Sequence, residues 1–221
     1  MKRQFWTDLL FAVQILCTLA FGGAQFVRLL ATAQGVSTSW YVFWEAFILM
    51  NFSLAVSAHR TQPSRVTAQT LVSYLCWMVM ITADIAVMAW KQTGEWSLID
   101  TMTSTIATLG IVGTLVWART RNIGISDPMA KGWLALFFKA VPQLMLAWNI
   151  AQRGGAGLTL IAIITGHVTI LTRLGQLYAS IKEAGWDRNR TGSAFSEAGN
   201  EVSWVVVTIA WLVAHTRQLG G

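Results

Sequence analysis

The chain has 221 residues, of which 54% are hydrophobic and only 12% are charged, and its mean hydropathy is +0.51. A soluble domain usually carries about 25% charged residues, so the composition excludes a soluble enzyme, a secreted disulfide-stapled domain and a disordered chain. At about 20 residues per crossing, the apolar content suffices for several membrane spans. Twelve Trp also fit the aromatic belts of membrane interfaces. The composition therefore predicts a polytopic membrane protein.

Seven apolar segments follow one another along the chain. Each is expected to be a helix, because strands in lipid need a closed barrel to satisfy their backbone. The last segment is the shortest and follows the most polar stretch, 182–201. The fold class expected is thus all-α, with seven transmembrane helices over residues 9–30, 40–58, 70–90, 98–117, 132–151, 158–181 and 202–215.

The distribution of basic residues between loops predicts the orientation, since cytoplasmic loops carry an excess of Lys and Arg. The loops on the N-terminal side hold Lys2, Arg3, Arg60, Arg65, Arg119, Arg121, Lys131, Lys182, Arg188 and Arg190. The other side holds Arg28, Lys91, Arg153 and Arg217. The N-terminus is therefore predicted in the cytoplasm and the C-terminus outside. These loops also account for the net charge of +6, and without a basic run containing interleaved aromatics no nucleic-acid partner is expected.

The sequence lacks the residues that several kinds of chemistry require. Cys17 and Cys76 both lie in apolar stretches and build neither a disulfide framework nor a zinc site. No phosphate-cradling glycine loop, nucleophile elbow or His-Glu-x-x-His helix occurs, and residues 202–215 lack the Lys that a retinal protein needs. We expect no enzymatic activity, no metal and no cofactor.

An internal repeat organises the spans. Ala24-Gln25 corresponds to Pro142-Gln143, residues 35–37 to residues 157–159, and residues 72–74 to residues 202–204. The offset between the copies grows only across loops. This order predicts two parallel three-helix bundles, 1–90 and 132–221, joined by a linking helix and its loops, 91–131, in a 3+1+3 arrangement.

These landmarks resemble the PQ-loop family, which includes the SWEET sugar carriers and lysosomal amino-acid exporters. Val141-Pro142-Gln143-Leu144 through Trp148, followed by Gly157-Leu158-Thr159, is similar to the family's Pro-Gln, aromatic, Gly-Leu-Ser progression. The first copy, Gly22-Gly23-Ala24-Gln25, keeps the Gln and lacks the Pro. The resemblance implies a carrier whose solute binds between two bundles that rock against each other.

Pro142 interrupts an apolar helix, because it removes a backbone hydrogen bond and clashes with the preceding turn. It is a candidate hinge, with a static kink as the alternative, and Gly22 and Gly23 are the candidate hinge of the first copy. Gln25 and Gln143 can bond either the freed backbone, which we favour, or a passing solute.

Ionisable residues inside a membrane are candidate functional residues. The repeat maps Glu45 onto His167, and either could bind a solute or carry a proton. Asp84 and Lys139 are further candidates for proton or charge coupling. The alternatives are a place in the headgroup layer for Glu45, a neutral helix cross-link for His167, and structural salt bridges for Asp84 and Lys139.

Asn51 and Asn149 could line a cavity or cross-link helices, and Trp44 and Trp148 are the tryptophans assigned to the cavity rather than to interface anchoring. We expect a carrier for an amino acid, a sugar or a vitamin-like nucleoside, with a charged or proton-linked solute preferred. A membrane receptor or sorting protein on the same fold is the alternative. The expected partners are the solute and the lipid bilayer, and a homo-oligomer is left open.

Overall fold

The computed structural model describes residues 2–94 and 96–219, and all regular secondary structure within them is helical, so the all-α fold is confirmed. In chain order the elements are α1 (Lys2–Ala31), α2 (Thr38–Thr61), α3 (Arg65–Lys91), α4 (Leu98–Thr120), α5 (Pro128–Ala135), the π-helical turn η1 (Leu136–Ala140), α6 (Val141–Arg153), α7 (Leu160–Ala184) and α8 (Arg188–Leu219). Because α5, η1 and α6 follow one another without a break, they form one continuous rod. The described residues thus build seven long rods.

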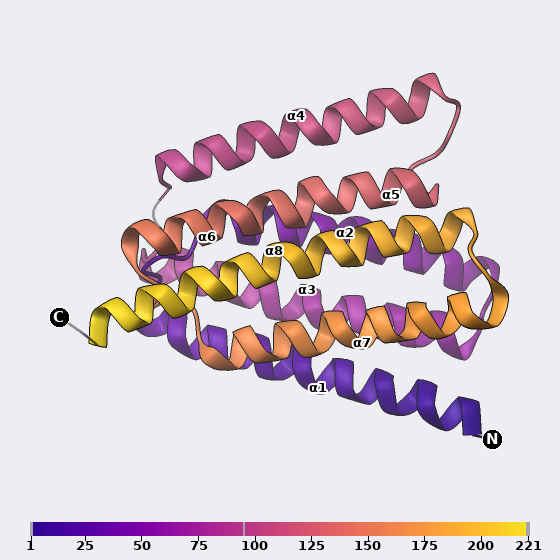
Figure 1. Ribbon diagram of the computed structural model, residues 1–221, viewed down its shortest axis with the longest axis horizontal. Coiled ribbons are helices and arrows are strands. Elements are labelled where there is room, and N and C mark those ends of the chain that lie inside the picture. The colour runs from indigo at the N-terminus through magenta and orange to yellow at the C-terminus, as the bar shows by residue number, and fades with distance from the viewer. Residues whose placement is uncertain (1, 95, 220–221) are drawn as a thin grey trace.

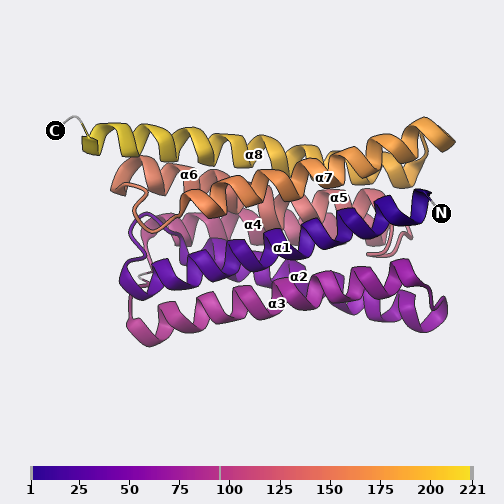
Figure 2. The ribbon, with the colours of Figure 1, turned by 90° about the horizontal axis from the view of Figure 1, so that it is seen from below.

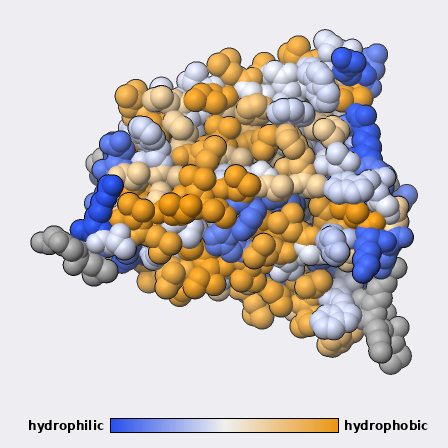
Figure 3. Space-filling model, viewed as in Figure 1, coloured by the Kyte–Doolittle hydropathy of each residue, from blue (hydrophilic) through white to orange (hydrophobic). Residues whose placement is uncertain are grey.

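Six of the rods are long and apolar enough to cross a membrane: α1 from Phe5, α2, α3, α4, the α5–α6 rod and α7. The protein is therefore an integral membrane protein. The face shown in Figure 3 agrees, because hydrophobic residues predominate over the middle of the molecule, apart from a hydrophilic patch near its centre, and hydrophilic residues gather at both ends. Large apolar side chains such as Leu16, Leu109 and Ile164 remain exposed along the rods, where lipid would cover them.

The last rod, α8, differs from the expectation. A span was expected over 202–215 with a polar connection before it, but the helix already begins at Arg188 and takes in most of that stretch. Its polar first half explains why α8 is not among the six apolar rods. The polar residues can lie in a helix because Glu197 and Glu201 find partners on α7, namely Arg173 and His167.

We call α1, α2 and α3 the first group and the α5–α6 rod, α7 and α8 the second group, and α4 belongs to neither. In the first group α3 packs against both α1 and α2, and in the second α8 packs against both α7 and the α5–α6 rod. The groups meet where α1 packs against α7 and where α2 packs against η1 and α6, while α4 contacts α2 and the α5–α6 rod (Figures 1 and 2). The N- and C-terminal ends of the chain lie at opposite ends of the molecule (Figure 1).

Side-chain caps fix where several helices begin. Ser37, Ser64, Ser97 and Thr159 each accept a hydrogen bond from a backbone N–H of the first turn that follows. Asp127 caps α5 in the same way and also accepts hydrogen bonds from the Arg188 guanidinium, which hold the pKa of the Asp127 carboxyl below its usual value. This contact ties the α4–α5 connection to the start of α8.

Candidate functional site

A small cavity of about 50 Å³ lies between the two groups of rods, near the middle of their length. Its lining comes from α1, α2, α3, η1, α6, α7 and α8, so it depends on both groups. One part of its wall is aromatic and another is polar and basic.

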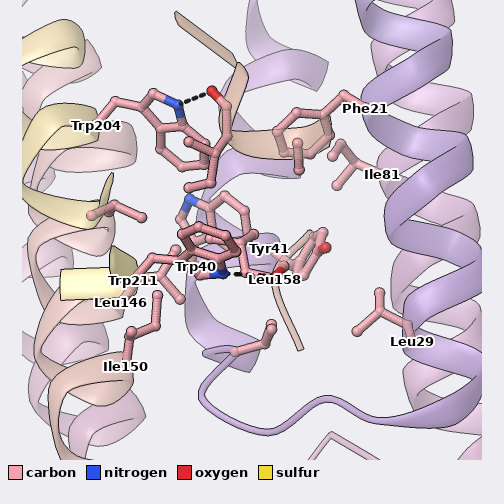
Figure 4. Packing of buried hydrophobic residues seen from close by; sticks show 14 of the residues in the cluster. Phe21, Leu29, Trp40, Tyr41, Ile81, Leu146, Ile150, Leu158, Trp204 and Trp211 are labelled. Atoms are coloured by element: carbon pink, nitrogen blue, oxygen red, sulfur yellow. Dashed lines mark hydrogen bonds between the residues drawn. The ribbon is translucent and has the colours of Figure 1, made fainter. Parts of the chain in front are cut away.

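The aromatic part is built by Phe21, Trp44, Trp77 and Trp204. The ring centroids of Trp44 and Trp77 are 5.0 Å apart, and those of Phe21 lie 5.3 Å from Trp44 and 5.5 Å from Trp77. Trp204 is held by a hydrogen bond of 3.2 Å from its indole N–H to the carbonyl of Ile163 (Figure 4). Because these rings are fixed by mutual packing, they offer a preformed apolar surface.

The polar part combines Lys139 with an amide network. Gln143 donates to the Asn200 side-chain oxygen at 3.1 Å and accepts a short hydrogen bond from the Ser203 hydroxyl. The Lys139 ammonium lies 5.5 Å from the centroid of the Phe47 ring. Gln143, Asn200 and Lys139 line the cavity, and their polar groups are buried away from lipid.

A larger hollow of about 770 Å³ adjoins the cavity on the side at which α1 begins. Tyr74 and Arg173 line both spaces, so they form the boundary between the cavity and this vestibule. Arg173 lies 3.6 Å from a carboxylate oxygen of Glu197. Across the vestibule Gln14 of α1 donates a long hydrogen bond, 3.4 Å, to Gln176 of α7.

The opposite end is closed by the connections α1–α2 and α6–α7. Gln25 of the first group donates to the carbonyl of Gly157 at 2.8 Å and accepts from the backbone N–H of Thr159 at 3.0 Å. Reciprocally, Asn149 of the second group donates to the carbonyl of Val36 at 3.3 Å. Each group therefore holds the connection of the other.

The two connections also touch directly. Gly157 donates its N–H to the carbonyl of Gln34 at 2.8 Å. Gly35 has a positive φ of +79°, and a Cβ there would lie 1.8 Å from the Gly154 carbonyl oxygen. Only glycine allows this approach. Next to the connections, the Trp211 indole N–H donates to the backbone carbonyl of Leu158 at 2.9 Å, among buried apolar side chains (Figure 4).

The residues proposed from the sequence divide between these places. Trp44, Gln143 and Lys139 line the cavity, while Gln25 and Asn149 hold the closed end. Asn51 donates to the carbonyl of Phe47 within its own helix, and Trp148 is 58% exposed. Neither Asn51 nor Trp148 lines the cavity.

Glu45 and His167, which the predicted repeat maps onto each other, do not contact each other. Glu45 accepts a hydrogen bond from Thr82 at 2.9 Å, so it points to α3 of its own group. His167 likewise points to α8, with its ring nitrogens 2.7 Å from Glu201 and 2.9 Å from Thr208. The cavity lining includes neither of them.

Asp84 is completely buried, and its carboxylate interacts with the buried Tyr41 hydroxyl without meeting the geometry of a hydrogen bond. Near the candidate hinges, a Cβ on Gly22 would lie 2.5 Å from the Met80 Cβ, so Gly22 lets α1 approach α3, whereas Gly23 faces open space. Pro142 is the second residue of α6, which begins immediately after the π-helical turn. Since proline clashes with the carbonyl four residues earlier, here that of Phe138, the wider turn accommodates it.

The sequence interpretation missed Asn200 and Glu201, because it placed both in the polar connection that ends at residue 201. It placed Trp204 in the last span but did not assign it to the cavity. Glu197, Glu201 and Thr208 are spaced four and seven residues apart, so they share one face of a helix. That spacing was the available signal that the polar stretch is helical and faces the protein interior.

The His167–Glu201 contact leads to an expected result for stability. His167→Leu leaves Glu201 half-buried without this partner, so we expect the free energy of unfolding in mixed detergent micelles to fall by about 1–3 kcal/mol. Adding Glu201→Gln should recover part of the loss, because an amide is cheaper to leave unpaired than a charge. Equal unfolding curves for wild type and His167→Leu would contradict this role.

Comparisons with known proteins find no match for this chain among family models, curated proteins or solved structures.

Proposed function

We propose that this protein is a membrane carrier that moves a small polar solute by alternating access. One observation carries the proposal: a cavity between two groups of helices adjoins an open vestibule at one end and is shut off from the other end by interlocked connections. This is the arrangement expected of a carrier in the state that is open to one side.

The two groups are proposed to be parallel repeats in a 3+1+3 plan, α1–α3 and α5–α8, with α4 as the linking helix. In support, the third rod of each group packs against the other two, and Gln25 and Asn149 make reciprocal contacts to the two connections. The resemblance to the PQ-loop family agrees with this plan. The excess of Lys and Arg in the loops at the vestibule end argues that the vestibule faces the cytoplasm, with all seven rods spanning the membrane.

The cycle requires the groups to move apart and together. Ligand pockets usually measure about 300–1,000 Å³, so a cavity of about 50 Å³ must widen before it accepts a solute. Entry from the vestibule would part Tyr74 from Arg173. Rocking of the two groups would then close the vestibule and separate the connections at the other end.

Uptake into liposomes tests the proposal. Purified protein is reconstituted into vesicles preloaded with a metabolite mixture, and exchange against the labelled members is followed; saturable exchange above empty vesicles is expected. A matched variant, Gln14→Cys/Gln176→Cys with Cys17 and Cys76 replaced by Ser, should lose exchange when a short bifunctional thiol reagent bridges the vestibule. Either monothiol variant treated alike is the control. Saturable binding without exchange would contradict a carrier and indicate a receptor.

Pro142→Ala tests whether the π-helical turn serves the movement. Restoring the backbone hydrogen bond should favour a regular helix, so we expect slower exchange with an unchanged equilibrium affinity for the solute. Pro63→Ala, in the exposed α2–α3 connection, is the control and should keep the wild-type rate. A static kink predicts the opposite: lower stability of Pro142→Ala with wild-type exchange per folded molecule.

A further inference from the structure

The charges at the central cavity do not balance. Lys139 and Arg173 both line it, and no carboxylate does so among the described residues. Glu197 approaches Arg173 at 3.6 Å from the vestibule side. No described carboxylate lies within ion-pair distance of Lys139, so the cavity carries an excess positive charge.

Keeping the Lys139 charge in this place is costly. Lys139 is only 8% exposed, and an unpaired cation at membrane depth is strongly destabilising unless it reaches the headgroup layer or water. Here the ammonium stays over the Phe47 ring at the cavity wall. A bound anion would offset the cost through a charge-assisted hydrogen bond.

The remainder of the wall suits a flat group. Trp44, Trp77 and Trp204 supply three indole rings, and planar groups stack against such rings at low entropic cost. Gln143 and Asn200 add amide groups that can bond polar ring substituents. Along the α5–α6 rod Lys139 lies one turn nearer the vestibule than Gln143, which puts the positive charge on the vestibule side of the amides.

We infer that the central cavity binds a small planar aromatic anion, with its ring among the three indoles and its carboxylate on the Lys139 ammonium. Transport of this solute rests on the proposed function, but its binding does not. The assignment disfavours uncharged sugars, which lack the anion, and cationic amines, which Lys139 and Arg173 repel.

Binding to the purified protein in detergent tests this inference. The probes share one ring and differ in charge: indole-3-acetate, indole-3-acetamide and tryptamine, with acetate as the anion without a ring. Thermal stability and equilibrium dialysis are measured for each probe up to millimolar concentration. We expect indole-3-acetate to bind about tenfold or more tightly than the amide, as for a lost charged hydrogen bond, and tryptamine and acetate to bind more weakly still.

Three variants assign the preference to Lys139. Lys139→Met should abolish the preference for the acid over the amide while raising thermal stability, because a buried unpaired charge is removed. Lys139→Arg should retain the preference, and so should Lys131→Met, which removes a charge two turns earlier on the same rod. Equal binding of acid and amide, no saturable binding of the acid, or an unchanged preference in Lys139→Met would each overturn the inference.

The outcomes separate this inference from the proposed function. If the protein binds the acid selectively but exchanges no anion in liposomes, the anion site is supported and the carrier is refuted. Saturable exchange in liposomes together with equal binding of the acid and the amide would support the carrier and refute the anion site.

Discussion

Trp204→Ala will lower the free energy of unfolding by about 3–5 kcal/mol, the usual cost of truncating a large aromatic side chain in a packed core. Trp204 is only 2% exposed, and its ring centroid lies 6.1 Å from that of Trp40 and 6.2 Å from that of Phe21. Alanine removes these contacts and the hydrogen bond to the Ile163 carbonyl. Unfolding in mixed detergent micelles, followed by circular dichroism, measures the loss.

Trp148→Ala is the matched control, because Trp148 was the other tryptophan assigned to the cavity and is instead largely exposed. A surface substitution of this kind should change stability by less than about 0.5 kcal/mol. Trp204→Phe keeps a ring and loses the indole N–H, so an intermediate cost is expected. Equal losses for Trp148→Ala and Trp204→Ala would contradict the central place of Trp204.

Gly35→Ala will force apart the two connections that close the end opposite the vestibule. Alanine at a φ of +79° costs about 1–2 kcal/mol, and its Cβ would collide with the Gly154 carbonyl oxygen. Overpacking of this kind adds about 1–3 kcal/mol. The buried Val36, replaced by Cys in a background without the native cysteines, should then react at least about tenfold faster with an impermeant thiol reagent.

Two controls make this result specific to the closed end. Gly23→Ala adds a methyl group where nothing lies within 4 Å, so labelling of Cys at position 36 should not change. A cysteine in place of the completely buried Ile81 reports general unfolding and should stay protected in Gly35→Ala. Unchanged labelling at position 36 in Gly35→Ala would show that the connections do not form a closure.

Part of the site follows from the sequence. Lys139 and Gln143 lie four residues apart in an apolar segment, so helical periodicity alone puts them on one face, and the expense of a polar face in lipid turns it inward. Trp44, which was also assigned to the cavity from the sequence, lines it as well. The predicted repeat maps Glu45 onto His167, but the structure directs each side chain to the third helix of its own group, where Glu45 bonds Thr82 and His167 bonds Glu201. Correspondence in a repeat gives equivalent positions, and it does not make side chains face each other.

The sequence by itself determined the membrane class, the all-α fold and most helix positions, because hydropathy and the need to satisfy every backbone group in lipid act locally along the chain. Only the tertiary structure showed which partners the acids of the polar stretch before residue 202 have, namely Arg173 and His167 on α7. It also showed that the counterpart of the Gln25 contact to the α6–α7 connection is made by Asn149, and not by Gln143: Asn149 bonds the α1–α2 connection. The contacts of Gln25 and Asn149 join residues more than a hundred positions apart. All these pairings depend on how the rods rotate and pack, which periodicity within one helix does not specify.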